Sequence, residues 1–321
     1  MSPRLTLALD TGLILSEPLS ILLPTPDHDL SALPRGSQVV QPFKPFHDHF
    51  AAQGFAAIPD SDDPCTDAVL FQPRAKAQAR ALVHQACTCA SGTVVVDGAK
   101  TDGIDSLLKD IRRRVPVEGP ISKAHGKIFW FQADAETFAD WAAPEVQRVD
   151  GFHTAPGVFS ADGIDPASEL LLTALPDKPG RHIADLGAGW GFLSARLLNS
   201  DYIRGVHLVE ADHTALTCAR ANVPDPRASF HWADARQWKA HEPVDTVVMN
   251  PPFHTSRSAD PALGQDFITA AARNLTGSGH LWMVANRHLP YEATLAERFA
   301  TVEEVTGNNR FKVLHASRPR R

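Results

Sequence analysis

The residues best suited to chemistry form a polar turn directly after the apolar run 245–249: Asn250, Pro251, Pro252 and Phe253. The run is typical of a buried strand, and open α/β sheets bind ligands at the carboxyl ends of their strands. Both prolines lack an N–H group and fix φ, so the turn is stiff and its carbonyl groups are free. The Asn250 side-chain oxygen and the Pro251 carbonyl could each accept one hydrogen of a planar amine, while Phe253 stacks on its ring. The turn suits methyl transfer to nitrogen, and a proline-stiffened loop capped by asparagine is the alternative.

A glycine-rich stretch about sixty residues upstream could bind the cofactor of such a reaction. Gly187, Gly189 and Gly191 follow a short apolar strand that contains Asp185, and they let the backbone approach a ligand closely. The helical pattern that follows points N–H groups at the same place. A second predicted strand ends at Glu210, whose carboxylate could accept hydrogen bonds from both hydroxyls of a ribose. Nicotinamide dehydrogenases use the spacing G-x-G-x-x-G instead, and an ordinary glycine turn is the alternative.

Two further segments hold candidate contacts for a nucleoside cofactor. Asp234 follows a predicted strand at 228–231, so it could bond an adenine amino group with Ala233 or Ala235 beside the ring. An exposed turn aspartate is the alternative reading. Asp165 followed by proline predicts the start of a helix.

Length and composition limit the possible classes of protein. The chain has 321 residues, 43% of them hydrophobic, which is enough for two domains with real cores. The apolar stretch at 5–23 is broken by charges and a proline, so we expect no membrane span and a cytoplasmic protein. The formal net charge of −6 gives no global basic field for nucleic acid. No metal site is expected, because the histidines at 47 and 49 lack a third ligand, and the cysteines are reduced thiols: Cys65, Cys87, Cys89 and Cys218.

The first half of the sequence repeats the pattern of the second half. The segment 67–74 (DAVLFQPR) aligns with 245–253 (DTVVMNPPF), and a helix-period segment follows each. Each half then has two further predicted strands in equivalent positions: 91–96 and 125–132 in the first half, and 278–284 and 310–315 in the second. A strand at 37–41 is followed by Pro42 where the glycine loop would be, and Gln72 replaces asparagine. The first copy is therefore expected to lack a cofactor site.

We accordingly expect an α/β fold of two tandem Rossmann-like domains, each a mostly parallel sheet with helices on both faces and an antiparallel last strand. Residues 1–133 form the degenerate copy, which supports the catalytic domain or holds substrate, and residues 151–321 form the catalytic domain. A helix-like linker spans 134–150. Candidate phosphate contacts are basic residues: Arg112, Arg113, Arg114, Lys123, Lys127, Arg318, Arg320 and Arg321.

Several motifs of the second half resemble those of a known family. The segments GVFS-DGID, DLGAGWG, NPPFH, VAN, LPY and RFKV, between residues 151 and 317, are similar to the bacterial small-subunit ribosomal RNA (guanine-N2) methyltransferases. These belong to the class I S-adenosylmethionine-dependent methyltransferases. The resemblance implies S-adenosylmethionine as cofactor and a guanine 2-amino group of 16S rRNA as acceptor, within the small ribosomal subunit or its precursor.

The resemblance also implies roles for residues of the two loops. Phe159 is expected over the methionine end of the cofactor, with a core phenylalanine as the alternative. The full set expected to hold the cofactor is Asp185, Gly187, Ala188, Gly189, Gly191, Glu210, Ala211, Asp234, Ala235, Asn250 and Phe159. Other possible activities are amino-methyl transfer to 23S rRNA, to adenine or to a protein glutamine, and an inactive assembly factor that binds rRNA. We expect a monomer.

Overall fold

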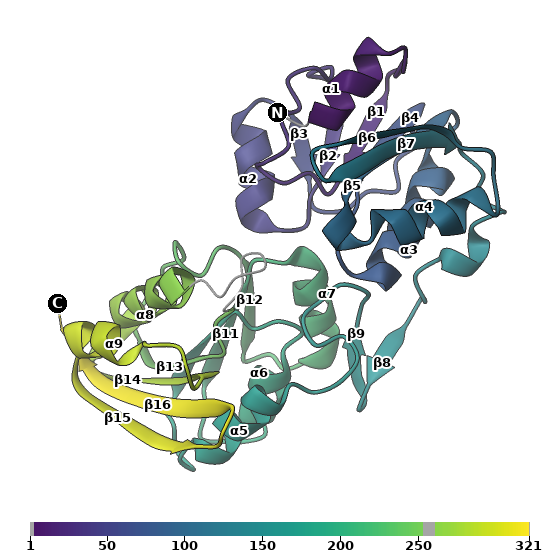
Figure 1. The fold of residues 1–321 in the computed structure, drawn as a ribbon. Coiled ribbons are helices and arrows are strands. Elements are labelled where there is room, and N and C mark those ends of the chain that lie inside the picture. The colour runs from purple at the N-terminus through teal and green to yellow at the C-terminus, as the bar shows by residue number, and fades with distance from the viewer. Residues whose placement is uncertain (1–2, 253–260, 321) are drawn as a thin grey trace. The chain divides into compact units, whose positions relative to one another are not determined.

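The computed structural model describes residues 3–252 and 261–320, and the chain divides into two compact units, Met1–Glu145 and Val146–Arg321. Each unit is built around a seven-stranded sheet (Figure 1). Phe253, to which we assign base stacking, and His254 lie outside the described residues. The division falls within the segment predicted as a linker.

The first unit has a sheet with the strand order β3-β2-β1-β4-β5-β7-β6. Its strands are β1 (Leu19–Leu22), β2 (Gln38–Val40), β3 (Ala56–Ile58), β4 (Asp67–Phe71), β5 (Thr93–Ala99), β6 (Glu118–Lys123) and β7 (Gly126–Gln132). The first five pair in parallel, and the pairings β5–β7 and β6–β7 are antiparallel. All five residues of β4 are buried, as expected for a central strand covered on both faces.

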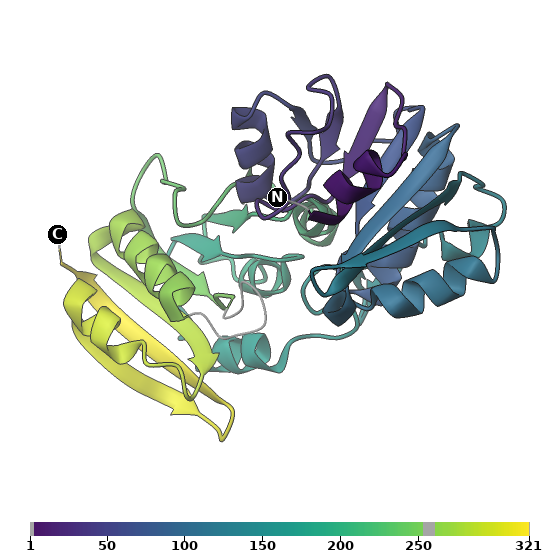
Figure 2. The ribbon, with the colours of Figure 1, turned by 45° about the horizontal axis from the view of Figure 1, so that its top comes forward.

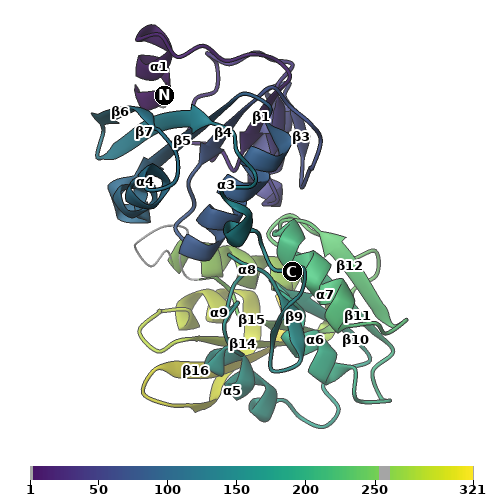
Figure 3. The same cartoon turned by 90° about the vertical axis from the view of Figure 1, so that its right-hand side faces the viewer.

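Helices cover both faces of this first sheet. One apolar core joins the sheet to α3 (Lys76–Cys89) and α4 (Ile104–Arg112), and the other joins it to α1 (Pro3–Asp10) and α2 (Lys44–Ala52). In Figure 3, α1 and α4 lie on opposite sides of the strands. The short 3-10 helices η1 (Lys100–Asp102) and η2 (Ala139–Trp141) complete the unit.

The second unit repeats this order as β12-β11-β10-β13-β14-β16-β15. Its strands are β10 (His182–Leu186), β11 (Gly205–Glu210), β12 (Ala228–Trp232), β13 (Val244–Met249), β14 (Leu275–Asn286), β15 (Phe299–Gly307) and β16 (Phe311–Pro319). The β14–β16 and β15–β16 pairings are antiparallel, and Figure 2 shows these three strands side by side. A small hairpin, β8 (Gln147–Val149) with β9 (Phe152–Thr154), precedes the sheet. The predicted fold class and duplication are confirmed.

The helices of the second unit also divide between the two faces. One core contains residues of α5 (Pro166–Ala174), α6 (Phe192–Leu197) and α7 (His213–Asn222), and the other contains residues of α8 (Pro261–Asn274) and α9 (Glu292–Arg298). Figure 1 shows α8 and α9 on one side of the strands and α5 and α6 on the other. Asp165 caps α5 by accepting the Ser168 N–H at 2.8 Å, and Pro166 starts the helix, as predicted.

Two details of the sequence-based description were wrong. In the second unit the glycine loop follows β10, which lies between β11 and β13 in the sheet. The equivalent strand of the first unit is β1, because it lies between β2 and β4. The strand predicted at 37–41 is β2, which matches β11 instead. The segment 134–150 is also not a continuous helix: it contains only η2 before β8, and the backbone is already extended at Ala142.

Candidate functional site

The glycine loop connects β10 to α6 and is held in a left-handed backbone conformation. The φ angles of Gly187, Gly189 and Gly191 are 76°, 55° and 87°. At Gly189 a Cβ atom would meet nothing within 4 Å, so this backbone borders open space. At Gly191 a Cβ would meet Val223 Cγ2 at 3.0 Å. Gly191 therefore allows close packing of the loop against the end of α7, and its contact with the cofactor remains a prediction.

Asp185 lies behind this loop and not at its surface. Its side chain is fully buried, and its Oδ2 accepts a hydrogen bond from the Ser194 hydroxyl of α6 at 2.7 Å. The other oxygen, Oδ1, has no hydrogen-bond partner. Burial raises the pKa of this carboxyl to about 7. Asp185 thus ties the start of α6 to β10, whereas we had expected it to contact the cofactor.

Glu210 stands at the carboxyl end of β11, the neighbouring strand. Its Oε2 accepts the Gly189 N–H at 2.8 Å and its Oε1 accepts the Asp212 N–H at 2.8 Å. Burial raises the pKa of Glu210 to about 7. The carboxylate therefore fixes the position of the glycine loop relative to β11 and retains lone pairs that can accept further hydrogen bonds.

Asn250 follows β13 directly, next to the glycine loop in the sheet order. Its Nδ2 donates to Asp165 Oδ2 at 2.8 Å and to Ser168 Oγ at 3.0 Å. Since a carboxylate only accepts hydrogen bonds, these contacts assign the amide nitrogen and leave the Asn250 carbonyl oxygen free of them. Pro251 is buried and Pro252 is exposed.

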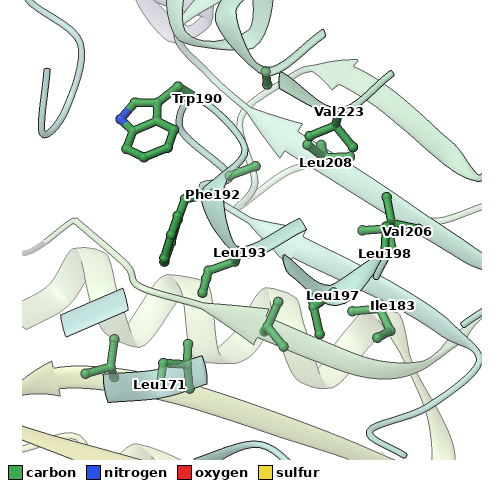
Figure 4. Packing of buried hydrophobic residues seen from close by; sticks show 14 of the residues in the cluster. Leu171, Ile183, Trp190, Phe192, Leu193, Leu197, Leu198, Val206, Leu208 and Val223 are labelled. Carbon is green, nitrogen blue, oxygen red and sulfur yellow. The ribbon is translucent and has the colours of Figure 1, made fainter. Parts of the chain in front are cut away.

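Phe159 lies at the mouth of the site. Its side chain is 57% exposed, which rules out the alternative of a core phenylalanine. Its backbone carbonyl accepts the indole N–H of Trp190 at 2.9 Å, and Ser160 beside it has a φ of 51°. The Trp190 and Phe192 rings lie next to each other in the core below, as Figure 4 shows, with centroids 5.8 Å apart. A buried indole thus anchors the segment that presents Phe159.

These elements form one pocket at the carboxyl ends of β10 and β13. Its lining includes five predicted site residues, Phe159, Gly187, Ala188, Gly189 and Asn250, together with Ser160, Asp165, Ser168, Trp190, Phe192 and Leu193. The remaining candidates are not part of this lining: Asp185, Gly191, Glu210, Ala211, Asp234, Ala235, Pro251 and Pro252. The pocket therefore unites the start of the glycine loop with the asparagine turn.

Three further residues predicted to contact the cofactor, Asp234, Ala235 and Ala211, are bonded to other groups or buried. The Asp234 carboxylate accepts the guanidinium of Arg236, with Oδ2 2.7 Å from Nη2, and Ala235 is buried. The Ala211 carbonyl accepts the Trp232 indole N–H at 2.9 Å. The contacts of Asp234 and Ala235 with an adenine, and of Ala211 with the cofactor, remain predictions.

The residues present fit S-adenosylmethionine. The left-handed turn at Gly189 leaves open space where a Cβ would stand, so a ligand can lie against the backbone there. The half-buried Glu210 carboxylate has lone pairs for the two ribose hydroxyls. Phe159 and Asn250 line the same pocket as Gly189.

The basic residues proposed as phosphate contacts are mostly engaged within the protein. Arg114 pairs with Asp140 and lies over the Trp141 ring, and Arg113 and Lys127 contact Asp110 and Asp105. Arg318 donates to Thr301 Oγ1 within the last sheet pairing. Among the described residues, no cluster of His, Cys, Asp or Glu could hold a metal ion, and no helix is long and apolar enough to cross a membrane.

Sequence reasoning missed several residues of the pocket. Asp165 was identified only as a helix start, and Ser168, Ser160 and Trp190 were not singled out. The D-P-x-S pattern does predict a capped helix. Nothing local in the sequence predicts that Asp165 also reaches Asn250, 85 residues away.

Comparison with known proteins shows what this chain is similar to. A family model described as methyltransferase small domain matches residues 150–315. The ribosomal RNA small subunit methyltransferase C of Shewanella piezotolerans is 30% identical over 291 residues, which are 84% of this chain and 84% of that protein. The ribosomal RNA large subunit methyltransferase G of Aeromonas salmonicida is 34% identical over 183 residues, or 54% of this chain and 48% of that one.

A solved structure has the same fold over nearly the whole chain. It is the T. thermophilus 16S rRNA N2 methyltransferase in complex with AdoMet and guanosine, with a TM-score of 0.77 and 23% identity, covering 97% of this chain and 90% of that one. Since the family model covers more than half of the sequence, the resemblance of this chain to the small-subunit ribosomal RNA methyltransferases is confirmed. The chain belongs to the methyltransferase small domain family and is a class I S-adenosylmethionine-dependent methyltransferase related to the bacterial small-subunit ribosomal RNA methyltransferases.

Proposed function

We propose that this protein transfers a methyl group from S-adenosylmethionine to the exocyclic 2-amino group of a guanine in 16S rRNA. The observation that carries the proposal is the orientation of Asn250 in the glycine-loop pocket. Because its Nδ2 donates to Asp165 and Ser168, its Oδ1 is available to accept a hydrogen from an amine. The name of the S. piezotolerans relative supports small-subunit rRNA as the acceptor.

The residues of the chain hold and orient the two reactants. Gly187, Gly189 and Glu210 would hold S-adenosylmethionine, which supplies an activated methyl group on its sulfonium. Asn250 Oδ1 and the Pro251 carbonyl would each accept one amine hydrogen, which turns the nitrogen lone pair toward the methyl group and stabilises the positive charge that develops on nitrogen. Phe253 would stack on the base.

No strong base is needed in this mechanism. A methylated ammonium is very acidic, so the nitrogen can release its proton to solvent. A paired guanine cannot present its amine in this geometry, and the target must therefore be flipped out or already unpaired. We assign catalysis to residues 151–321, and support or substrate binding to residues 1–133.

The test is transfer of labelled methyl groups to small ribosomal subunits that lack the modification. Free 16S rRNA serves as a parallel acceptor, and nucleoside mass spectrometry identifies the labelled product. We expect N2-methylguanosine in 16S rRNA. Label in adenosine, or no label with cofactor bound, contradicts the proposal, and the second outcome favours an rRNA-binding assembly factor.

A second candidate is the same reaction on 23S rRNA. It is favoured by the similarity to the large subunit methyltransferase G of A. salmonicida, at 34% identity. Large subunits and a protein extract therefore belong in the same assay. N2-methylguanosine in 23S rRNA selects this candidate, and labelled glutamine selects a protein methyltransferase.

A further inference from the structure

We propose that Asp165 is a positioning residue that fixes the side-chain amide of Asn250, turns its carbonyl oxygen toward the acceptor amine and adds negative charge behind it. The inference rests on the proposed amine acceptor and adds a residue on α5 to its machinery. Asp165 and Ser168 line the same pocket as Asn250 and Gly189.

Three hydrogen bonds converge on a single oxygen of Asp165. Its Oδ2 accepts from Ser168 N at 2.8 Å, from Ser168 Oγ at 3.1 Å and from Asn250 Nδ2 at 2.8 Å. Asn250 Nδ2 also donates to Ser168 Oγ at 3.0 Å. Asp165, Ser168 and Asn250 therefore form a closed triangle, in which every donor is assigned because the carboxylate can only accept.

The triangle determines which way the Asn250 amide faces. The two ends of an asparagine amide have nearly the same shape, so packing alone does not distinguish them. A flipped amide would set its oxygen against Asp165 Oδ2, and two acceptors would face each other. The carboxylate thus keeps the nitrogen toward α5, and the oxygen is left for the acceptor.

A helix cap alone does not explain this arrangement. Capping α5 requires only an oxygen that accepts the Ser168 N–H, which serine, threonine, asparagine or aspartate supplies. The contact from Asp165 to Asn250 joins α5 to the end of β13, 85 residues away. Capping and positioning can therefore be separated by substitution.

The charge of Asp165 adds a second effect. An anion that accepts from the amide N–H polarises the amide and increases the electron density on its oxygen. Positive charge develops on the acceptor nitrogen as it forms its bond to the methyl carbon. A charged aspartate is therefore expected to stabilise the transition state more than a neutral side chain of the same shape does.

The substitutions Asp165→Ser and Asp165→Asn separate the cap, the geometry and the charge. Serine caps the helix but does not reach Asn250. Asparagine can place its one side-chain oxygen where Oδ2 stands and keep all three contacts without the charge. We expect Asp165→Ser to lower kcat about 10- to 100-fold, as loss of a supporting hydrogen bond does elsewhere. Asp165→Asn should lie between it and the unchanged protein, with the KM for S-adenosylmethionine little altered in both.

A double-mutant cycle distinguishes positioning from loss of structure. In an Asn250→Ala background, Asp165→Ser should have no further effect on kcat, because its target is gone. An equal loss in both backgrounds overturns the proposal, as does a kcat for Asp165→Ser within about twofold of the unchanged protein. If Asp165→Ser fails to fold, Ser168→Ala tests the same triangle, with a smaller expected loss.

A spectroscopic measurement tests the orientation without any turnover. The Asn250 side-chain N–H resonances, identified by their loss in Asn250→Ala, should shift and exchange faster with water in Asp165→Ser, and should stay close to their original positions in Asp165→Asn. Unchanged resonances in Asp165→Ser overturn the inference. Absence of methyl transfer by the unchanged protein refutes the proposed function instead, and this measurement still decides the Asn250 orientation.

Discussion

The two units share one strand order, but the segments that follow their central strands differ. In the second unit the first sheet strand, β10, runs into the glycine loop and α6. In the first unit β1 runs into residues 23–37, which are all described and contain no helix. The His28 ring of this segment stacks on Phe71 at the end of β4, with centroids 4.0 Å apart. The place that is an open pocket in one unit is covered by the chain itself in the other.

The side chains at matching strand ends also differ. Gln72 follows β4 as Asn250 follows β13, but its Nε2 donates to the Asp102 carbonyl at 2.7 Å. Gln41 follows β2 and donates to the Pro24 carbonyl at 2.7 Å, whereas β11 ends in Glu210. The polar side chains at the strand ends of the first unit thus donate hydrogen bonds to backbone carbonyls of that unit, and those of the second unit hold the loops of a pocket. Buried apolar residues stabilise the same sheet in both units, and a few residues at the strand ends determine whether the sheet carries a ligand pocket.

The largest expected effect on stability lies in the first unit. Arg4 of α1 forms a buried ion pair with Asp97 of β5, and their side chains are 9% and 0% exposed. Arg4→Met removes the cationic partner of this buried carboxylate, so we expect the first unit to lose about 3–5 kcal/mol of its free energy of unfolding. Denaturant unfolding followed by hydrogen exchange in peptides of residues 1–145 measures the loss.

The double substitution Arg4→Met with Asp97→Leu is the control for this loss. It should recover much of the stability, because no charge then remains buried. Binding of S-adenosylmethionine should not change, since the pocket belongs to the other unit. A loss below about 1 kcal/mol in Arg4→Met would mean that water screens the pair.

The next effect concerns Asn250 and its counterpart Gln72. Asn250→Ala removes the proposed acceptor of the amine hydrogen, and we expect kcat to fall about 10²- to 10³-fold. The affinity for S-adenosylmethionine, measured by calorimetry, should stay nearly unchanged. Gln72→Ala is the matched control and should leave both quantities as they are. Equal losses of turnover and cofactor affinity in Asn250→Ala would refute the assigned role.

A smaller effect is expected at two glycines that both have a positive φ angle. Gly189 in the pocket and Gly54 in the first unit both have positive φ, and a Cβ at either would meet nothing within 4 Å. Alanine should cost each about 1–2 kcal/mol of stability through backbone strain. Only Gly189→Ala should weaken S-adenosylmethionine binding, by about tenfold or more, because its Cβ projects into the ligand space. Similar affinities in the two variants would show that the cofactor does not contact this backbone.

Much of the fold and part of the site followed from the sequence. The duplication, the glycine loop and the asparagine turn could be predicted because burial and turn geometry leave local patterns. The triangle around Asn250 could not, since Asp165 and Ser168 meet Asn250 only after the sheet has formed. The position of β1 was missed because its four-residue apolar run, Leu19–Leu22, lies in a longer apolar stretch without a clear period.

The last comparison is between two buried aspartates. Asp97 forms an ion pair with Arg4, whereas Asp185 Oδ1 has no hydrogen-bond partner. Burial raises the pKa of Asp185 from 3.8 to about 7, so between these values the folded protein holds a proton that the unfolded chain releases. Stability must then fall as pH rises from about 4 to 7, by at most about 1.4 kcal/mol per pH unit, and level off above.

Chemical unfolding at a series of pH values, compared between the unchanged protein and Asp185→Asn, isolates this effect. The Glu210 carboxyl, whose pKa is also raised to about 7, contributes equally to both proteins and cancels in the difference. Asp225→Asn is the opposite control, because the Arg227 side chain lowers the pKa of Asp225 to about 2 and its contribution to stability is lost only as the solution becomes acidic. Identical pH profiles for the unchanged protein and Asp185→Asn would mean that the pKa of Asp185 is the same in the folded and unfolded states, which contradicts the raised value.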